Sequence, residues 1–131
     1  MTRRGALGAI GIVVLAAVVV SAAGLLARDD EAPRSKLRGA SADRGRDALV
    51  AYGCGSCHTI PGVRGANARV GPSLADWSQR SYVAGRLPNR PAELTLWIRH
   101  PQRVEPGSAM PELGVSPRAA RDIAQYLYRL R

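Results

Sequence analysis

Two cysteines and a histidine stand together in the run Cys54-Gly55-Ser56-Cys57-His58, and the 131-residue chain has no other cysteine. Two thiols three positions apart lie on one side of a helical turn, so both can form thioether bonds to a single porphyrin. His58 then brings an imidazole to the iron. The C-x-x-C-H pattern is that of covalent c-type haem attachment, and it predicts one haem c.

Other uses of paired cysteines need residues that this chain does not have. A structural zinc site needs four ligands, commonly two C-x-x-C pairs, and only Cys54 and Cys57 are present. A thioredoxin-like redox pair needs a strand before it and a βαβ pattern around it. A plain disulfide remains open in an oxidising compartment, although it gives His58 no role.

The composition favours a basic domain with little material for a core. The chain has 19 Lys and Arg against 10 Asp and Glu, a net charge of +9, no Phe, and only 5% aromatic residues. A basic surface suits nucleic acid, anionic lipid or an acidic protein, and charge alone does not choose among them. A buried porphyrin would supply the bulk that the side chains lack.

The N-terminal part reads as a membrane anchor followed by a spacer. Residues 5–27 are uncharged and apolar, and as a helix they would be about 34 Å long, enough to cross a bilayer. A cleaved signal peptide is the alternative, but its apolar part is shorter and ends at a better cleavage site. We expect a transmembrane anchor at 1–27, a flexible linker at 28–40 and a folded domain at 41–131.

Helix signals recur through the folded domain. Ser41 is a candidate cap for a helix at 42–53, and a short helix is expected near 74–79. Pro91 fits the first turn of a helix that ends before Pro101, and Ser116-Pro117 opens a last helix that runs to the end. No strand and no repeat is evident. The expected class is all-α: about 3–5 helices around a covalent haem, preceded by one N-terminal transmembrane helix.

With Gly71-Pro72-Ser73-Leu74, Met110-Pro111 and the terminal run at 123–127 following Cys54 to His58, the chain resembles a class I cytochrome c over residues 41–131. The segments at 85–91, 97–102 and 106–114 are similar, more narrowly, to the cytochrome c domain fused to subunit II of some haem-copper oxidases. The copper-binding part of that subunit is missing here. The resemblance implies a separate, membrane-anchored version of that domain.

Met110 is the candidate second axial ligand. Apart from Met1 it is the only methionine, and it lies in a loop rich in Pro and Gly, where core filler is unusual. The resemblance places the family's sixth iron ligand at this position, opposite His58. His100, just before Pro101, is the alternative ligand, although a surface histidine at a helix end is the ordinary interpretation.

The resemblance also implies roles for residues around the haem. The carbonyl of Pro61 would accept the second ring N–H of His58, and Pro72 would pack on the same side. Gly45 would mark the crossing of the first and last helices, with Tyr126 and Leu127 facing it. Candidates for contact with the haem propionates are Trp77, Arg80, Tyr82 and Trp97; simple core packing or exposure is the alternative for each.

A haem with histidine and methionine ligands has no open position for substrate, so the expected function is electron transfer and not catalysis. We expect a respiratory carrier on the periplasmic side of the bacterial cytoplasmic membrane, held in the bilayer through residues 5–27. The expected donor is a quinol-oxidising complex or a cytochrome, and the acceptor a haem-copper oxidase with an acidic docking surface. An exported domain meets no nucleic acid. The alternatives are a fixed electron-transfer subunit of an oxidase or reductase, and a five-coordinate haem protein that binds gas or acts as a peroxidase.

Overall fold

The computed structural model describes residues 37–131. The predicted anchor at 5–27, and the predicted linker up to residue 36, lie outside the described residues. The elements follow in the order α2 (Ala42–Ala51), η1 (Cys54–Ser56), η2 (Trp77–Gln79), β1 (Tyr82–Val83), β2 (Leu87–Pro88), α3 (Pro91–Arg99), α4 (Pro101–Val104) and α5 (Pro117–Leu127), where η denotes a 3-10 helix.

The predicted all-α class is wrong, because β1 and β2 form a small antiparallel sheet in which Tyr82 pairs with Pro88 and Val83 with Leu87. The chain between them turns through Ala84 and Gly85, which both have positive φ. Within residues 37–131 no helix has the length and apolar character to cross a bilayer. What the structure describes is four α-helices joined by irregular loops, with one short hairpin.

The helix starts follow the capping signals of the sequence. The Ser41 hydroxyl accepts from the backbone N–H of Arg44 at 3.4 Å, and the Ser116 hydroxyl accepts from Ala119 N–H at 3.2 Å. Pro91 and Pro117 occupy the first turns of α3 and α5, where no intrahelical donor is lost. The predicted starts of these three helices are therefore confirmed.

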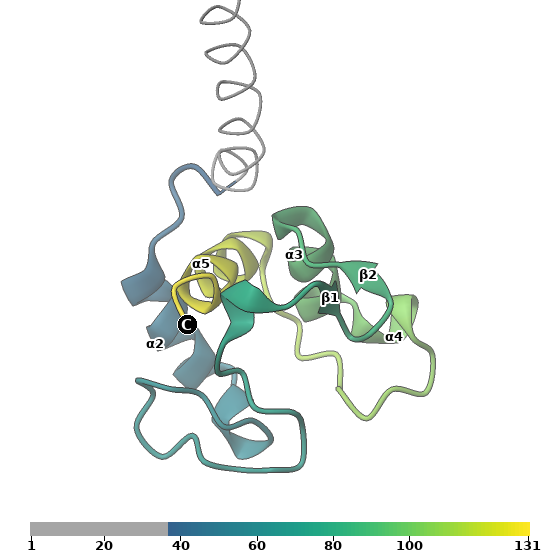
Figure 1. The fold of residues 1–131 in the computed structure, drawn as a ribbon, viewed down its shortest axis with the longest axis horizontal. Helices are drawn as coiled ribbons and strands as arrows, with labels where there is room; N and C mark the ends of the chain where they lie inside the picture. The colour runs from purple at the N-terminus through teal and green to yellow at the C-terminus, as the bar shows by residue number, and fades with distance from the viewer. Residues whose placement is uncertain (1–36) are drawn as a thin grey trace, which may run out of the picture. The chain divides into compact units, whose positions relative to one another are not determined.

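Helices α2 and α5, the first and last of the described unit, lie side by side (Figure 1). They approach most closely at Gly45, where a Cβ atom would overlap the backbone carbonyl of Asp122. The predicted crossing at Gly45 is confirmed, but Asp122 and Ile123 face it in place of Tyr126 and Leu127. Only glycine allows two helix backbones to meet at this distance.

One buried charge joins the same two helices. The Asp122 carboxylate accepts from Ser41 N–H at 2.7 Å, from Arg44 Nε at 2.9 Å and from Arg44 Nη2 at 2.9 Å. The Arg44 guanidinium beside it holds the pKa of Asp122 below its usual value of 3.8, and the bond from Ser41 acts in the same direction. The start of α2 is thereby fixed to the middle of α5.

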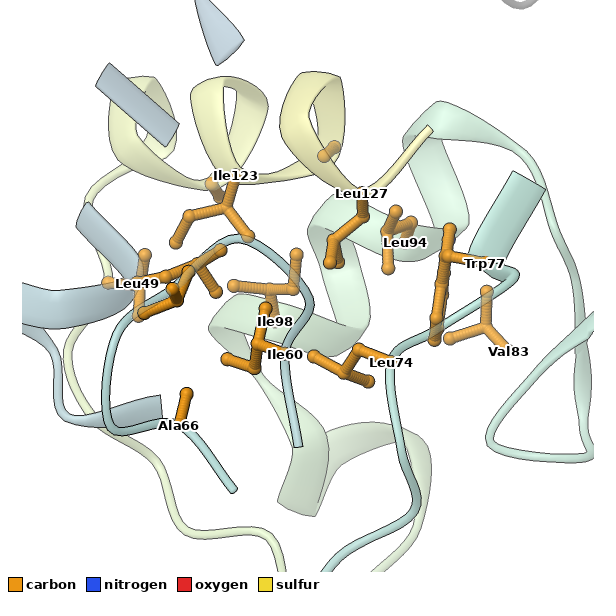
Figure 2. Close-up of a cluster of buried hydrophobic side chains, with 14 of the residues drawn as sticks. Leu49, Ile60, Ala66, Leu74, Trp77, Val83, Leu94, Ile98, Ile123 and Leu127 are labelled. Carbon is orange, nitrogen blue, oxygen red and sulfur yellow. The ribbon is translucent and has the colours of Figure 1, made fainter. Parts of the chain in front are cut away.

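The core lies between these helices and the irregular loops. Figure 2 shows Leu49 of α2 and Ile123 and Leu127 of α5 directed toward Ile98 and Leu94 of α3. Ile60, Leu74 and Trp77 close this cluster from the loop side. Leu37 is also buried in it, with 5% of its surface exposed, so the packed unit includes residues before Ser41.

Candidate functional site

The C-x-x-C-H run follows directly from the end of α2. Gly53 has φ 68°, a left-handed conformation that terminates the helix, and its N–H donates to Val50 O at 3.0 Å. The chain then makes the single turn η1, closed by His58 N–H on Cys54 O at 3.1 Å. Cys54, Cys57 and His58 therefore share one turn, as the spacing predicts.

The His58 ring is oriented by the carbonyl of Pro72, 2.7 Å from Nδ1. A carbonyl oxygen can only accept, so Nδ1 carries the proton and Nε2 keeps its lone pair for a metal. Pro61 was predicted for this role, and that prediction is wrong. The Pro61 carbonyl instead accepts from the Tyr126 hydroxyl at 2.6 Å, which ties the following loop to α5.

Gly71 lies against the same imidazole. A Cβ at this position would stand 2.5 Å from Cε1 and 2.8 Å from Nδ1 of His58. The backbone of Gly71 is brought there by its N–H, which donates to Cys57 O at 2.8 Å. Because Gly71 has no side chain, its backbone can pack directly against the His58 ring without displacing the ring.

The loop from Thr59 to Leu74 folds back on the motif, which explains how Pro72 reaches His58. Thr59 forms an isolated bridge with Asn67, and its hydroxyl donates to Ala68 O at 2.8 Å. Leu74 N–H then donates to Thr59 O at 2.8 Å. The result is a closed loop whose two ends lie at the histidine.

Cys54 and Cys57 are free thiols, each partly buried. Burial raises the pKa of the Cys54 thiol, so it is neutral at pH 7. Cys57 accepts a weak contact from the Ser56 hydroxyl at 3.8 Å. Covalent attachment of a haem through the two sulfurs stays a prediction.

Trp77 and Arg80 contact each other in the segment that follows this loop. The guanidinium of Arg80 lies 5.0 Å from the centre of the Trp77 ring, and its Nη2 donates to the carbonyls of Ser73 and Ala75. Trp77 is 5% exposed, and its buried Nε1 has no hydrogen-bond partner within the described residues. A buried N–H without a partner is costly, and an acceptor such as a propionate would satisfy it.

The other two propionate candidates are not part of this pair. Tyr82 lies on β1 with 61% of its surface exposed. Trp97 lies on α3, partly buried against the hydrophobic core. A haem contact for these two residues stays a prediction.

Asn89 is a supporting residue that the sequence did not reveal. Its side-chain amide donates to Trp77 O at 3.0 Å and to Arg80 O at 2.9 Å, and its oxygen accepts from the Tyr128 hydroxyl at 3.0 Å. It therefore holds the Trp77 and Arg80 segment against the end of α5. A lone asparagine between two prolines reads as a turn residue, so no sequence signal pointed to it.

Met110 lies in the irregular loop between α4 and α5, and it is partly buried. In Figure 1 this loop, drawn yellow-green, lies on the same side of the helices as the teal loop that follows the C-x-x-C-H turn. The Met110 carbonyl accepts from Gln102 Nε2 at 2.8 Å. His100 lies at the end of α3, where its Nδ1 is 3.9 Å from a carboxylate oxygen of Glu112.

The residues around His58 have features that suit a haem. Among residues 37–131 no three His, Cys, Asp or Glu side chains converge on one point. The oriented imidazole, the close approach of Gly71 and the unpartnered Trp77 Nε1 suit a planar group with carboxylates at its edge. His58 and Met110 would hold the iron, and Cys54 and Cys57 the porphyrin.

Comparison with known proteins finds similarity to cytochrome c oxidase subunit 2. The chain is 34% identical over 70 residues to that subunit of Alkalihalophilus pseudofirmus, which is 53% of this chain and 20% of the relative. It is 35% identical over 66 residues to the subunit of Bacillus sp. strain PS3, which is 49% of this chain and 18% of that relative. It is 28% identical over 89 residues to the subunit of Bacillus subtilis, which is 66% of this chain and 24% of that relative.

The chain therefore contains a region similar to cytochrome c oxidase subunit 2, and it spans about a fifth to a quarter of the length of these relatives. No family model matches the chain. No solved structure matches it either.

Proposed function

We propose that residues 37–131 form a mono-haem c-type electron-transfer domain that delivers single electrons to a haem-copper oxidase. Cys54 and Cys57 would hold the haem covalently, and His58 and Met110 would bind its iron. The observation that carries the proposal is the His58 ring, which follows a C-x-x-C turn and has its Nδ1 committed to Pro72 O. That commitment leaves Nε2 as the metal-binding atom.

A haem bound there would supply a one-electron iron couple. The protein residues orient and shield it. Pro72 and Gly71 would keep the His58 ring from rotating, the Trp77 N–H would be a donor for a propionate, and Met110 would bind the iron and so exclude oxygen or peroxide. A closed coordination shell favours electron transfer over substrate chemistry.

The context of the proposal comes from the relatives and from charge. The similarity to cytochrome c oxidase subunit 2 supports a place in a respiratory oxidase pathway. Fourteen arginines against seven acidic side chains leave +7 on residues 37–131, which supports a partner with an acidic docking surface. Haem c is attached outside the cytoplasm, so we place the domain at the outer face of the bacterial cytoplasmic membrane, with a quinol-oxidising complex or a cytochrome as donor.

A second candidate is a fixed electron-transfer subunit of an oxidase. It is favoured by the same similarity, because the relatives are themselves named as oxidase subunits. In that case the domain would pass electrons within one assembly and would not shuttle between complexes.

The absorption spectrum of the haem-loaded ferric protein tests the ligation. A weak long-wavelength band from an iron–methionine sulfur bond is expected, and Met110→Ala should abolish it. Loss of the band should be accompanied by binding of carbon monoxide to the ferrous variant but not to the parent protein. If the parent protein lacks the band at neutral pH, the proposed ligand set is wrong and an open haem becomes the better description.

A further inference from the structure

The side chain of Gln102 spans the loop that carries Met110. Its Nε2 donates to Ser108 O at 2.7 Å and to Met110 O at 2.8 Å. Its Oε1 accepts from Gly107 N–H at 3.0 Å. One amide therefore uses both of its donor hydrogens and its oxygen on a stretch of four residues.

The loop has little else to hold its shape. The Met110 N–H donates to the Ser108 hydroxyl at 3.3 Å, and the Met110 carbonyl is bound by Gln102. Both backbone polar groups of Met110 thus depend on side chains and not on a helix or sheet. Without these bonds the loop would be free to take many conformations.

Gln102 itself is held on a fixed support. It lies in α4, whose last turn is closed by Glu105 N–H on Pro101 O at 2.8 Å. Pro101 is fully buried, and Glu105 forms an ion pair with Arg86 at 2.9 Å, on the turn between β1 and β2. The position of the Gln102 amide is therefore set by α4, and not by the loop to which it is hydrogen-bonded.

We propose that Gln102 is the positioning residue that keeps the Met110 sulfur on the haem iron. This inference rests on the proposed function, because it gives the hydrogen bonds a role in ligand retention. An amide is the side chain that fits: it offers two donors to two carbonyls and one acceptor to an N–H. A carboxylate at this position would face the oxygens of Ser108 and Met110 and would repel them.

The consequence is a methionine ligand that resists displacement. With the loop held, the sulfur stays at high effective concentration near the iron; with the loop released, exogenous ligands compete more easily. Loss of three hydrogen bonds is expected to raise the apparent affinity of ferric protein for imidazole by about tenfold.

The test uses the full haem-loaded chain with Gln102→Ala, Gln102→Glu and Gln102→Asn. Gln79→Ala is the matched control, since Gln79 is exposed on η2 and lies outside the Met110 loop. Imidazole titration, the strength of the iron–sulfur band and the reduction potential are measured for each. We expect tighter imidazole binding, a weaker band and a lower potential for Gln102→Ala, a larger effect for Gln102→Glu, an intermediate one for Gln102→Asn, and no change for Gln79→Ala.

Two outcomes separate this inference from the proposed function. A parent protein without the iron–sulfur band overturns the ligation by Met110 and the inference with it. A parent protein with the band, whose Gln102 variants keep the parental imidazole affinity and potential, overturns the positioning role alone. Gln102→Asn keeps a polar amide one methylene shorter, so it decides the question even if Gln102→Ala fails to fold.

Discussion

The carboxylate of Asp122 is buried to 4% exposure, yet it remains charged because three donors surround it. Two of these donors belong to Arg44 and the third is the N–H of Ser41, the residue that caps α2. The Asp122 carboxylate stabilises the packing of α2 against α5 only while it is ionised. The stability of this helix contact therefore depends on pH.

Replacing Asp122 with Asn should lower stability at neutral pH and flatten its acid dependence. The folded pKa of Asp122 lies below its ordinary value of 3.8, so its contribution is present above about pH 3.8 and is lost as the pH falls through the lower folded value. Urea unfolding at pH 7 and at pH 3 checks this. The difference in the free energy of unfolding between the parent and Asp122→Asn should be smaller at pH 3 than at pH 7.

The matched control is Asp47→Asn, because the Asp47 side chain is 74% exposed and forms its ion pair with Arg46, its neighbour in the chain. The Asp47→Asn substitution should leave the midpoint of urea unfolding nearly unchanged at pH 7 and at pH 3. An equal loss for Asp122→Asn at pH 7 and pH 3 would mean that the ionised carboxylate is not what stabilises the joint.

At the scale of elements, the crossing of α2 and α5 sets the geometry of the site. The α2 helix ends three residues before Cys54, and the Tyr126 hydroxyl of α5 holds the carbonyl of Pro61 just after His58. Any shift of one helix against the other therefore moves the turn that carries the two thiols. Gly45 is where the crossing is closest.

Gly45→Ala should destabilise the protein by about 3 kcal/mol, because its methyl group would overlap the backbone carbonyl of Asp122 and force the helices apart. Thermal and urea unfolding measure the loss. Val50→Ala, on an exposed position of the same helix, is the control and should change little. A Gly45→Ala variant as stable as the parent would show that the crossing tolerates a wider separation.

The helices could be predicted from the sequence because their signals are local. Ser41 and Ser116 cap the helices that follow them, and Pro91 stands at the first turn of α3. The hairpin escaped prediction because each strand has only two residues and one of them is Pro88. The helix α4 has four residues, too few to show a period.

The shared turn of the candidate site could be predicted from the sequence, and its longer-range contacts less well; its chemistry stays a prediction. The spacing of Cys54, Cys57 and His58 is written in one run, so their shared turn followed directly. The acceptor for His58 is Pro72, 14 positions further along the chain, and no local pattern in the sequence encodes how the intervening loop folds back. Asn89 and Gln102 act through such long-range bonds as well.

At the scale of the whole molecule, charge is the dominant feature. Residues 37–131 carry seven more arginines than acidic side chains and no lysine. Three of these arginines form ion pairs within the described residues: Arg44 with Asp122, Arg46 with Asp47, and Arg86 with Glu105. The remaining field would attract an acidic partner over about a Debye length, which is roughly 10 Å at 0.1 M salt.

Electron transfer to a haem-copper oxidase should therefore weaken with salt. Between about 10 mM and 150 mM ionic strength we expect the second-order rate constant to fall by about tenfold. Stopped-flow oxidation of the reduced protein measures it, and reaction with a small uncharged oxidant is the control. A rate independent of salt, together with co-migration with an oxidase in mild detergent, would instead favour the fixed-subunit role.

The pairing of α2 with α5 joins the beginning of the described unit to its end, with the thiol turn in between (Figure 1). The contacts between α2 and α5 can form only after the last described helix, Pro117–Leu127, has been made. In the proposed haem-binding role, Cys54 and Cys57 would lie in a segment that is made well before the helix against which α2 packs. Because long-range contacts slow folding, the segment that carries the two thiols would complete its packing late.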